Sequence, residues 1–122
     1  MAKTIMVVDD SVSLRQVVSI ALSSAGYSVI EACDGRDALA KLNGQKVNLI
    51  ISDVNMPNMD GISLVREVKK LSDHKFTPII MLTTESQDNM KKEGQAAGAK
   101  AWVVKPFLPQ QMLSAVSKLI SP

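Results

Sequence analysis

The sequence predicts an α/β fold in which five parallel strands form one doubly wound sheet with helices on both faces. Five short apolar runs alternate along the chain with segments whose apolar residues recur at helical spacing. The 122 residues are enough for one domain with a buried core. We therefore expect a single domain over residues 1–122, with no separate output domain.

Four of the apolar runs suit buried strands of a parallel sheet, because they have almost no polar residue within them. They cover residues 5–8, 49–52, 79–82 and 101–104. The run at 28–31 is half polar, which favours a position at the edge of the sheet. Since crossovers between parallel strands are right-handed, covering both faces requires one reversal of direction. The result is the flavodoxin-like strand order 2-1-3-4-5.

Local signals bound several of the helices between these strands. Gly26 follows the first helical pattern, Asp34 can cap the second, and Pro109 suits the first turn of the last. The helix expected near residues 86–97 has the weakest apolar stripe, and Gly94 lowers its helical propensity further. Helices are thus predicted between all the strands and after the last one.

Polar residues follow the four apolar runs at the point where each strand ends. Asp9 and Asp10 follow the first run, and Asp53, Thr83 and Lys105 follow the other three. The carboxyl ends of parallel strands meet at one edge of the sheet, where ligands bind at the point of chain reversal. We therefore expect three carboxylates, a hydroxyl and an ammonium group in one site.

This set of groups favours a divalent cation and phosphoryl chemistry. Two carboxylates 4 Å apart repel each other by about 4 kcal/mol at an effective dielectric constant of 20, so the cluster needs positive charge. Mg²⁺ prefers a few carboxylates together with water and phosphate. A carboxylate can also act as a nucleophile that carries a phosphoryl group. Asp53, alone on its strand, is the best nucleophile candidate, while Asp9 and Asp10 suit the metal.

The same residues closely resemble those of bacterial two-component response regulator receiver domains, in particular the stand-alone chemotaxis regulators of the CheY type. Residues 53–61, DVNMPNMDG, resemble the D-x-x-M-P-x-M-x-G turn of the family. Gly98-Ala99 followed by Lys105-Pro106-Phe107 is similar to a second family pattern. Pro106 is a candidate for the cis form. The resemblance covers essentially the whole chain.

The resemblance implies a role for each residue of the site. Asp53 would accept a phosphoryl group from a phosphohistidine on a partner histidine kinase, in a Mg²⁺-dependent reaction without turnover of an external substrate. Lys105 would pair with the phosphoryl oxygens, and the hydroxyl of Thr83 would move toward them. The implied Mg²⁺ ligands are Asp10, Asp53 and the backbone carbonyl of Asn55, with Asp9 acting largely through water.

The resemblance also implies how the signal is read and ended. Trp102 stands where the family often has a tyrosine that rotates with Thr83, and the surface of the fourth helix, fifth strand and fifth helix would then bind a downstream protein. Asn55 and Glu85 resemble the family's pair that tunes loss of the phosphoryl group, and a phosphatase is a further candidate partner.

In chemotaxis the downstream target would be the flagellar motor switch, which controls flagellar rotation. The sequence departs from the pattern of enteric chemotaxis regulators at Ser11, Val54, Trp102 and Asp88. These departures leave the partner open. The alternative is a single-domain receiver that acts outside flagellar control, as a phosphate sink or as a regulator of another partner.

Other functional classes fit the residues less well. A flavodoxin-like electron carrier needs a hydroxyl- and glycine-rich loop after the first strand, where this chain has the acidic segment 9–12, DDSV. An aspartyl phosphatase usually has a second aspartate two residues after its nucleophile, where this chain has Asn55. A phosphate-independent interaction module would not need the complete set of acids, hydroxyl and lysine.

Composition narrows the cellular setting. The net charge of +2 does not indicate nucleic-acid binding, and no apolar stretch has the ~20 residues of a membrane span. With one cysteine, Cys33, there is no disulfide framework, and no leader is visible before the first strand. We expect a cytoplasmic monomer in which Cys33 packs near the second strand and His74 lies in a surface loop.

Overall fold

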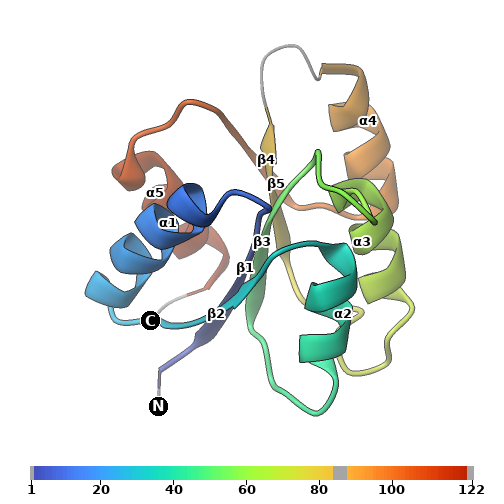
Figure 1. Cartoon of the computed structure of the whole chain (residues 1–122), viewed down its shortest axis with the longest axis horizontal. Helices are drawn as coiled ribbons and strands as arrows, with labels where there is room; N and C mark the ends of the chain where they lie inside the picture. Colours follow the sequence, from blue (N-terminus) through green and yellow to red (C-terminus); the bar gives the residue numbers. More distant parts are fainter. Residues whose placement is uncertain (1, 84–87, 121–122) are drawn as a thin grey trace.

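The computed structural model describes residues 2–83 and 88–120, and only the backbone of residues 88–91. Within this part of the chain, five parallel strands form one sheet in the predicted order β2-β1-β3-β4-β5 (Figure 1). The strands are β1 (Thr4–Val8), β2 (Ser28–Ala32), β3 (Leu49–Asp53), β4 (Ile79–Thr83) and β5 (Ala101–Val104). The helices are α1 (Val12–Ser24), α2 (Gly35–Leu42), α3 (Gly61–Lys69), α4 (Asp88–Ala97) and α5 (Pro109–Leu119).

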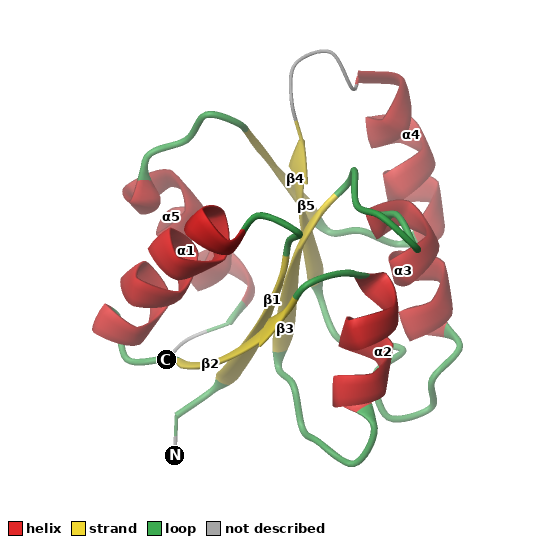
Figure 2. Cartoon of the chain, in the orientation of Figure 1, coloured by secondary structure: helices red, strands yellow, loops and turns green. Residues whose placement is uncertain are grey.

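Helices cover both faces of the sheet, as the alternating pattern predicted (Figure 2). Helices α1 and α5 lie on one face, and α2, α3 and α4 lie on the other. Alternate residues of a strand enter different cores: Met6 and Val8 of β1 pack toward α2 and α3, whereas Ile5 and Val7 pack toward α1 and α5. Burying apolar side chains on both faces explains why the central strands read as continuous apolar runs.

The edges of the sheet also follow the prediction. Strand β2 is only partly buried and pairs only with β1, and β5 forms the opposite edge. The residues of β3 and β4, in contrast, are buried without exception. Among the described residues, no helix has the length and apolar character needed to span a membrane.

Two sequence expectations outside the site are wrong. His74 is buried, with 5% of its surface exposed, and its Nε2 lies 3.1 Å from the carbonyl oxygen of Gln45. The ring therefore links the loop before β4 to the loop before β3 and is not a surface group. Cys33 is exposed because it follows the last inward-facing residue of β2, Ala32, and its backbone N–H donates to Asp37 Oδ2 at 3.0 Å.

Gly61 fixes how tightly the turn after β3 closes. Its N–H donates to the carbonyl oxygen of Val54 at 2.8 Å, and the residue begins α3. A Cβ atom on Gly61 would meet the backbone carbonyl oxygen of Asp53 and would lie 2.6 Å from Cε of Met81. No other residue fits there without moving the end of β3.

We predict that Gly61→Ala lowers the free energy of unfolding by about 3 kcal/mol, because the backbone oxygen cannot move aside as a flexible side chain could. Urea unfolding measures the change. Gly44→Ala is the control: Gly44 has φ 77° and no atom within 4 Å of a Cβ, so only backbone strain of about 1–2 kcal/mol is expected. A loss at Gly61 no larger than at Gly44 would contradict the steric argument.

Candidate functional site

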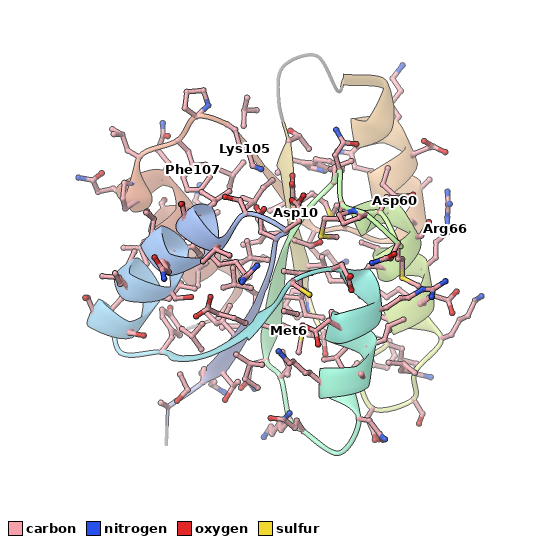
Figure 3. The ribbon with its side chains drawn as sticks, in the orientation of Figure 1. Met6, Asp10, Asp60, Arg66, Lys105 and Phe107 are labelled. Carbon is pink, nitrogen blue, oxygen red and sulfur yellow. The ribbon has the colours of Figure 1, made fainter. Side chains whose placement is uncertain are left out.

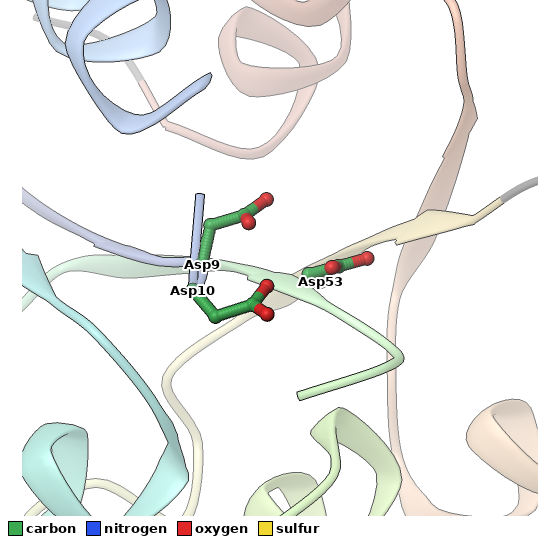
Figure 4. A group of neighbouring side chains, drawn as sticks. All are labelled: Asp9, Asp10 and Asp53. Atoms are coloured by element: carbon green, nitrogen blue, oxygen red, sulfur yellow. The ribbon is translucent and has the colours of Figure 1, made fainter. Parts of the chain in front are cut away.

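Three carboxylates meet at the carboxyl edge of the sheet, at the ends of β1 and β3. Asp9 and Asp10 follow β1, and Asp53 is the last residue of β3 (Figure 4). Val8 and Ser52 are opposite each other in the pairing of these strands, so Asp9 and Asp53 lie at the same level. One oxygen from each of the three carboxylates lies within 4.8 Å of the others. The structure thus brings together the acids that the sequence predicted to meet.

Lys105 and Thr83 come to the same edge from β5 and β4. Lys105 Nζ lies 3.0 Å from Asp53 Oδ1 and 3.5 Å from Asp9 Oδ2, and the labelled Lys105 and Asp10 lie at this end of the molecule (Figure 3). The peptide bond between Lys105 and Pro106 is cis, as the sequence suggested. Thr83 is buried, and its carbonyl oxygen accepts from the N–H of Lys105 at 2.6 Å.

The two oxygens of Asp53 have different surroundings. Oδ1 accepts from the N–H of Val54 at 2.9 Å and also faces the ammonium group of Lys105. Oδ2 has no hydrogen bond to any residue that the structure describes. The carboxylate is therefore held in place through Oδ1.

Asp9 is the most deeply buried acid of the site, with 1% of its surface exposed. Burial raises the pKa of its carboxyl above the ordinary value; the carboxylates of Asp53 and Asp10 also raise it, while the Ser11 N–H and Lys105 lower it. Oδ1 accepts from the N–H of Ser11 at 2.9 Å, but the buried Oδ2 has no hydrogen-bond partner among the described residues. The positive charge that faces this oxygen is the ammonium group of Lys105, 3.5 Å away, and Asp53 shares it.

The residues present fit a hard divalent cation. A buried carboxylate oxygen without a hydrogen bond, beside two further carboxylates, matches the oxygen donors that Mg²⁺ prefers. The residues that would hold the ion are Asp9, Asp10 and Asp53. Asn55 stands two residues beyond β3, and a ligand role for its backbone carbonyl stays a prediction.

The turn after β3 is tied to the neighbouring loop by a contact that the sequence did not reveal. Asn58 has a positive φ of 68°, and its Nδ2 donates to Asp34 Oδ2 at 2.8 Å. Asp34 also caps α2, as predicted, by accepting from the N–H of Asp37 at 2.8 Å. Asparagine tolerates this backbone conformation, so the sequence could have indicated the turn at Asn58. The sequence does not indicate that Asp34 is the hydrogen-bond partner of Asn58.

Arg15 of α1 is a second residue that sequence reasoning missed. Its Nη1 donates to the backbone carbonyl of Asp9 at 2.6 Å, and its Nε lies 3.3 Å from Glu31 Oε1. Arg15 therefore ties α1 to the end of β1 where the acids lie. Nothing in a single sequence indicates that this arginine, and not one of the other basic residues, lies there.

The residues predicted to read and to end the signal are described with one exception, Glu85. Trp102 lies on β5 opposite Met81, is half-buried, and packs against the core that contains α3. A depression of about 460 Å³ begins at Trp102 and runs beside β5 to Ser114 and Lys118 of α5. Glu85 lies outside the described residues.

The fold and the site together define a class of protein: a doubly wound domain with an acidic cluster, a lysine and a hydroxyl residue at its carboxyl edge. The family of the response regulator receiver domain matches residues 5–117. The chain therefore belongs to this family and is the receiver domain of a two-component response regulator.

Similar proteins have several different outputs. The chain is 34% identical to the chemotaxis protein CheY of Thermotoga maritima over 98% of both chains, and 37% identical to the protein PilG of Pseudomonas aeruginosa over 92% of this chain and 83% of PilG. The structure of the chemotaxis response regulator CheY4 of Vibrio cholerae is 48% identical, with a TM-score of 0.93 over 98% of this chain and 100% of that one. The chain spans about half the length of the transcriptional regulators it matches, among them the probable regulator ycf27 of Cyanophora paradoxa.

We predict that Asp9→Asn stabilises the protein in the absence of metal and weakens Mg²⁺ binding. Because the pKa of Asp9 is raised, the folded state binds this proton more tightly than the unfolded state. The contribution of the Asp9 carboxyl to the free energy of unfolding therefore falls as pH rises from about 4 through the raised pKa. Removing the charge should stabilise the protein at pH 7 by about 1 kcal/mol.

Urea unfolding in the presence of a chelator, at pH 4 and at pH 7, measures the change in stability. Titration of each protein with Mg²⁺ measures the loss of Mg²⁺ affinity. Asp60→Asn is the control, because Asp60 caps α3 outside the cluster. A destabilised Asp9→Asn protein that binds Mg²⁺ as before would contradict both the charge argument and the metal assignment.

Proposed function

We propose that this chain is a phosphorylation-activated switch in which Asp53 accepts a phosphoryl group from a phosphohistidine of a histidine kinase. One observation carries the proposal. The Asp53 carboxylate, at the end of a central strand, is held through Oδ1 by Val54 and Lys105, and Oδ2 has no described hydrogen bond. A fixed carboxylate beside an ammonium group is the arrangement that an in-line phosphoryl transfer requires.

The reaction follows from these contacts. An oxygen of the Asp53 carboxylate attacks the phosphorus atom, a P–O bond forms, and the P–N bond to the histidine breaks. The electron pair stays on the imidazole nitrogen, which takes up a proton from solvent. Lys105, now paired with Asp53 at 3.0 Å, is close enough to pair with the transferred phosphoryl oxygens. The protein phosphorylates itself in this way and turns over no external substrate.

Mg²⁺, bound by the acids of the site, would neutralise charge on the phosphoryl oxygens during transfer. A related structure supports this assignment: the receiver domain of a sensor histidine kinase from Pseudomonas aeruginosa is described with a magnesium ion coordinated in its active-site cleft. It is 26% identical to this chain, with a TM-score of 0.89. The buried Oδ2 of Asp9, which has no hydrogen bond to a described residue, supports it independently.

A donor protein that reaches Asp53 would cross an apolar surface. Leu14 and Val17 of α1 and Phe107 line a depression of about 470 Å³ that also includes Lys105. Val17 is exposed, so this surface is open to a partner. Contact with the kinase here would bring the phosphohistidine next to the lysine that pairs with Asp53.

We predict that acetyl phosphate with Mg²⁺ adds one phosphoryl group to the protein and that Asp53→Asn abolishes the addition, because the amide is not a nucleophile. Mass spectrometry of the intact protein measures the product, and a chelator should prevent it. Asp60→Asn is the matched control and should be labelled like the unsubstituted protein. Labelling of Asp53→Asn, or no labelling of the unsubstituted protein, would refute the assignment.

The phosphorylated state would be read on the surface formed by α4, β5 and α5. Thr83 ends β4 and Lys105 directly follows β5, the strand that contains Trp102. The hydroxyl of Thr83 would bond the phosphoryl group, and Trp102 would change position with it. Asn55 and Glu85 would set the lifetime of the phosphoryl group, together with any partner phosphatase.

Chemotaxis is the pathway we favour, with the flagellar motor switch as the target. Support comes from the similarity to two chemotaxis regulators over nearly their whole lengths. The alternative is a receiver that acts outside flagellar control, as a phosphate sink or on another partner. Similarity to transcriptional regulators, at 34–39% identity for their matched parts, favours neither pathway.

The two pathways predict different partners in a pull-down. If the chain acts in chemotaxis, the phosphorylated protein should retain purified flagellar switch proteins, because phosphorylation changes the α4–β5–α5 surface. Asp53→Asn, treated in the same way, should retain much less. Equal retention by the two proteins, or none by the phosphorylated protein, would remove the flagellar assignment and leave the phosphoryl chemistry intact.

A further inference from the structure

The turn after β3, residues 54–60, is held at its two ends by backbone hydrogen bonds. The N–H of Val54 donates to the carbonyl oxygen of Leu82 at 3.2 Å, and the N–H of Gly61 donates to the carbonyl oxygen of Val54 at 2.8 Å. Between these points, the backbone of residues 55–58 has no hydrogen bond to a described residue outside the turn. The path of this stretch therefore depends on side-chain contacts.

One of these contacts is a hydrogen bond to the residue that caps α2. Nδ2 of Asn58 donates to Oδ2 of Asp34 at 2.8 Å, while Oδ1 of Asp34 accepts from the N–H of Asp37, also at 2.8 Å. The hydrogen bond from Asp37 lowers the pKa of Asp34 most, and the one from Asn58 lowers it further. Asp34 is thus a charged acceptor that α2 holds in place, and it fixes the turn through Asn58.

A second contact places the same turn directly on the start of α2 (Figure 1). A Cβ atom on Gly35, the first residue of α2, would lie 2.8 Å from both Cβ and Cγ of Met59. Real Cβ atoms do not approach carbon atoms so closely, so a larger residue would push the turn away. Gly35 is not among the glycines with positive φ, so the approach of Met59 is what requires a glycine there.

The backbone of Asn58 is in an unfavourable conformation that these contacts stabilise. Its φ is 68°, a value that is unfavourable for residues other than glycine and is best tolerated by asparagine and aspartate. Such conformations persist where the surrounding structure stabilises them, and they cluster at ligand sites. The turn thus takes a path that it would not keep without its contacts to α2.

The same turn leads to the metal site through Asn55, three residues before Asn58. The backbone carbonyl of Asn55 is the predicted fourth ligand of Mg²⁺. A side chain can reach an ion by changing its rotamer, whereas the direction of a backbone carbonyl is set by the path of the chain. Contacts that orient metal ligands from outside the coordination sphere change metal affinity by about 10–100-fold.

We propose that Asn58 and Asp34 are positioning residues for the metal site, which hold the turn on α2 so that the carbonyl oxygen of Asn55 faces the acids before Mg²⁺ binds. Because the turn is already ordered, Mg²⁺ binding does not have to order it, and the affinity is higher. The proposal rests on the metal-dependent phosphoryl transfer proposed above. It extends the site to the start of α2, which supplies no ligand itself.

Asn58→Asp tests the hydrogen bond with little change of side-chain shape. Aspartate tolerates the positive φ of this position, but its carboxylate would repel that of Asp34 and push the turn away from α2. Calorimetric titration of the chelator-treated protein with Mg²⁺ should show an affinity about tenfold lower. The added negative charge alone favours a cation, so charge does not explain a loss. Unchanged or increased affinity would overturn the proposal.

The matched control is Asn43→Asp, which adds the same charge at the exposed residue that ends α2, at the opposite end of the helix from Asp34. This protein should bind Mg²⁺ like the unsubstituted one, because the turn after β3 is unchanged. An equal loss of affinity in Asn43→Asp and Asn58→Asp would also overturn the proposal.

The reciprocal exchange should restore the hydrogen bond. In the double variant Asp34→Asn with Asn58→Asp, the amide introduced at position 34 can donate to the new carboxylate, and its oxygen can still accept from the N–H of Asp37. We expect most of the Mg²⁺ affinity to return. A double variant that folds and binds Mg²⁺ as weakly as Asn58→Asp would contradict the assigned role of the hydrogen bond.

Asn58→Gly covers the case in which Asn58→Asp does not fold. Glycine adopts a positive φ without strain, but it has no side chain to donate to Asp34. The affinity for Mg²⁺ should again fall by about tenfold, because the turn is no longer held on α2. Undiminished affinity in Asn58→Gly would overturn the proposal.

Labelling by acetyl phosphate separates positioning of the metal from general damage to the fold. Measured over a range of Mg²⁺ concentrations, Asn58→Asp should need about tenfold more Mg²⁺ for half of its maximal labelling rate and should reach the rate of the unsubstituted protein at saturation. A lower maximal rate with an unchanged Mg²⁺ requirement would overturn the proposal. Absence of labelling in the unsubstituted protein would refute the proposed function, and the calorimetric affinities would still decide the positioning role.

Discussion

Repulsion among like charges at the carboxyl edge of the sheet is the constraint on which this structure depends. Parallel strands bring Asp9, Asp10 and Asp53 within 4.8 Å of one another because their carboxyl ends coincide. Lys105 offsets part of that charge through two contacts, and burial of Asp9 increases the cost of the remainder. The site is consequently built to gain stability when it receives a cation, and to be sensitive to any group that changes its charge.

The fold and the main site were predictable from the sequence because both depend on strong, regular signals. Continuous apolar runs identify central strands, a half-polar run identifies the edge strand β2, and the residue after each run lies at a known edge. Asp53 and Lys105 meet as expected for this reason. Predicting that Asp53 and Lys105 meet requires only the strand order, not the conformation of any side chain.

The remaining contacts were not predictable because they depend on loop paths and side-chain positions that the sequence pattern does not determine. His74, in a polar stretch, is buried because the loop before β4 packs on the loop before β3. Asn58 reaches Asp34, and Arg15 reaches the carbonyl oxygen of Asp9, across separations of 24 and 6 residues. Propensity and periodicity describe single elements, so they carry no information about which loops touch.

The ties on the two sides of the site differ in kind, and this difference has a mechanical consequence. On the side of β1 and β2, directional hydrogen bonds of Arg15 and Asn58 fix α1 and the turn after β3. On the side of β5, the indole of Trp102 meets Gly94 through shape alone. A hydrogen bond resists sliding because it loses energy with small changes of angle, whereas two apolar surfaces can slide while staying in contact. The hydrogen bonds of Arg15 and Asn58 thus resist small displacements more strongly than the contact between Trp102 and Gly94 does.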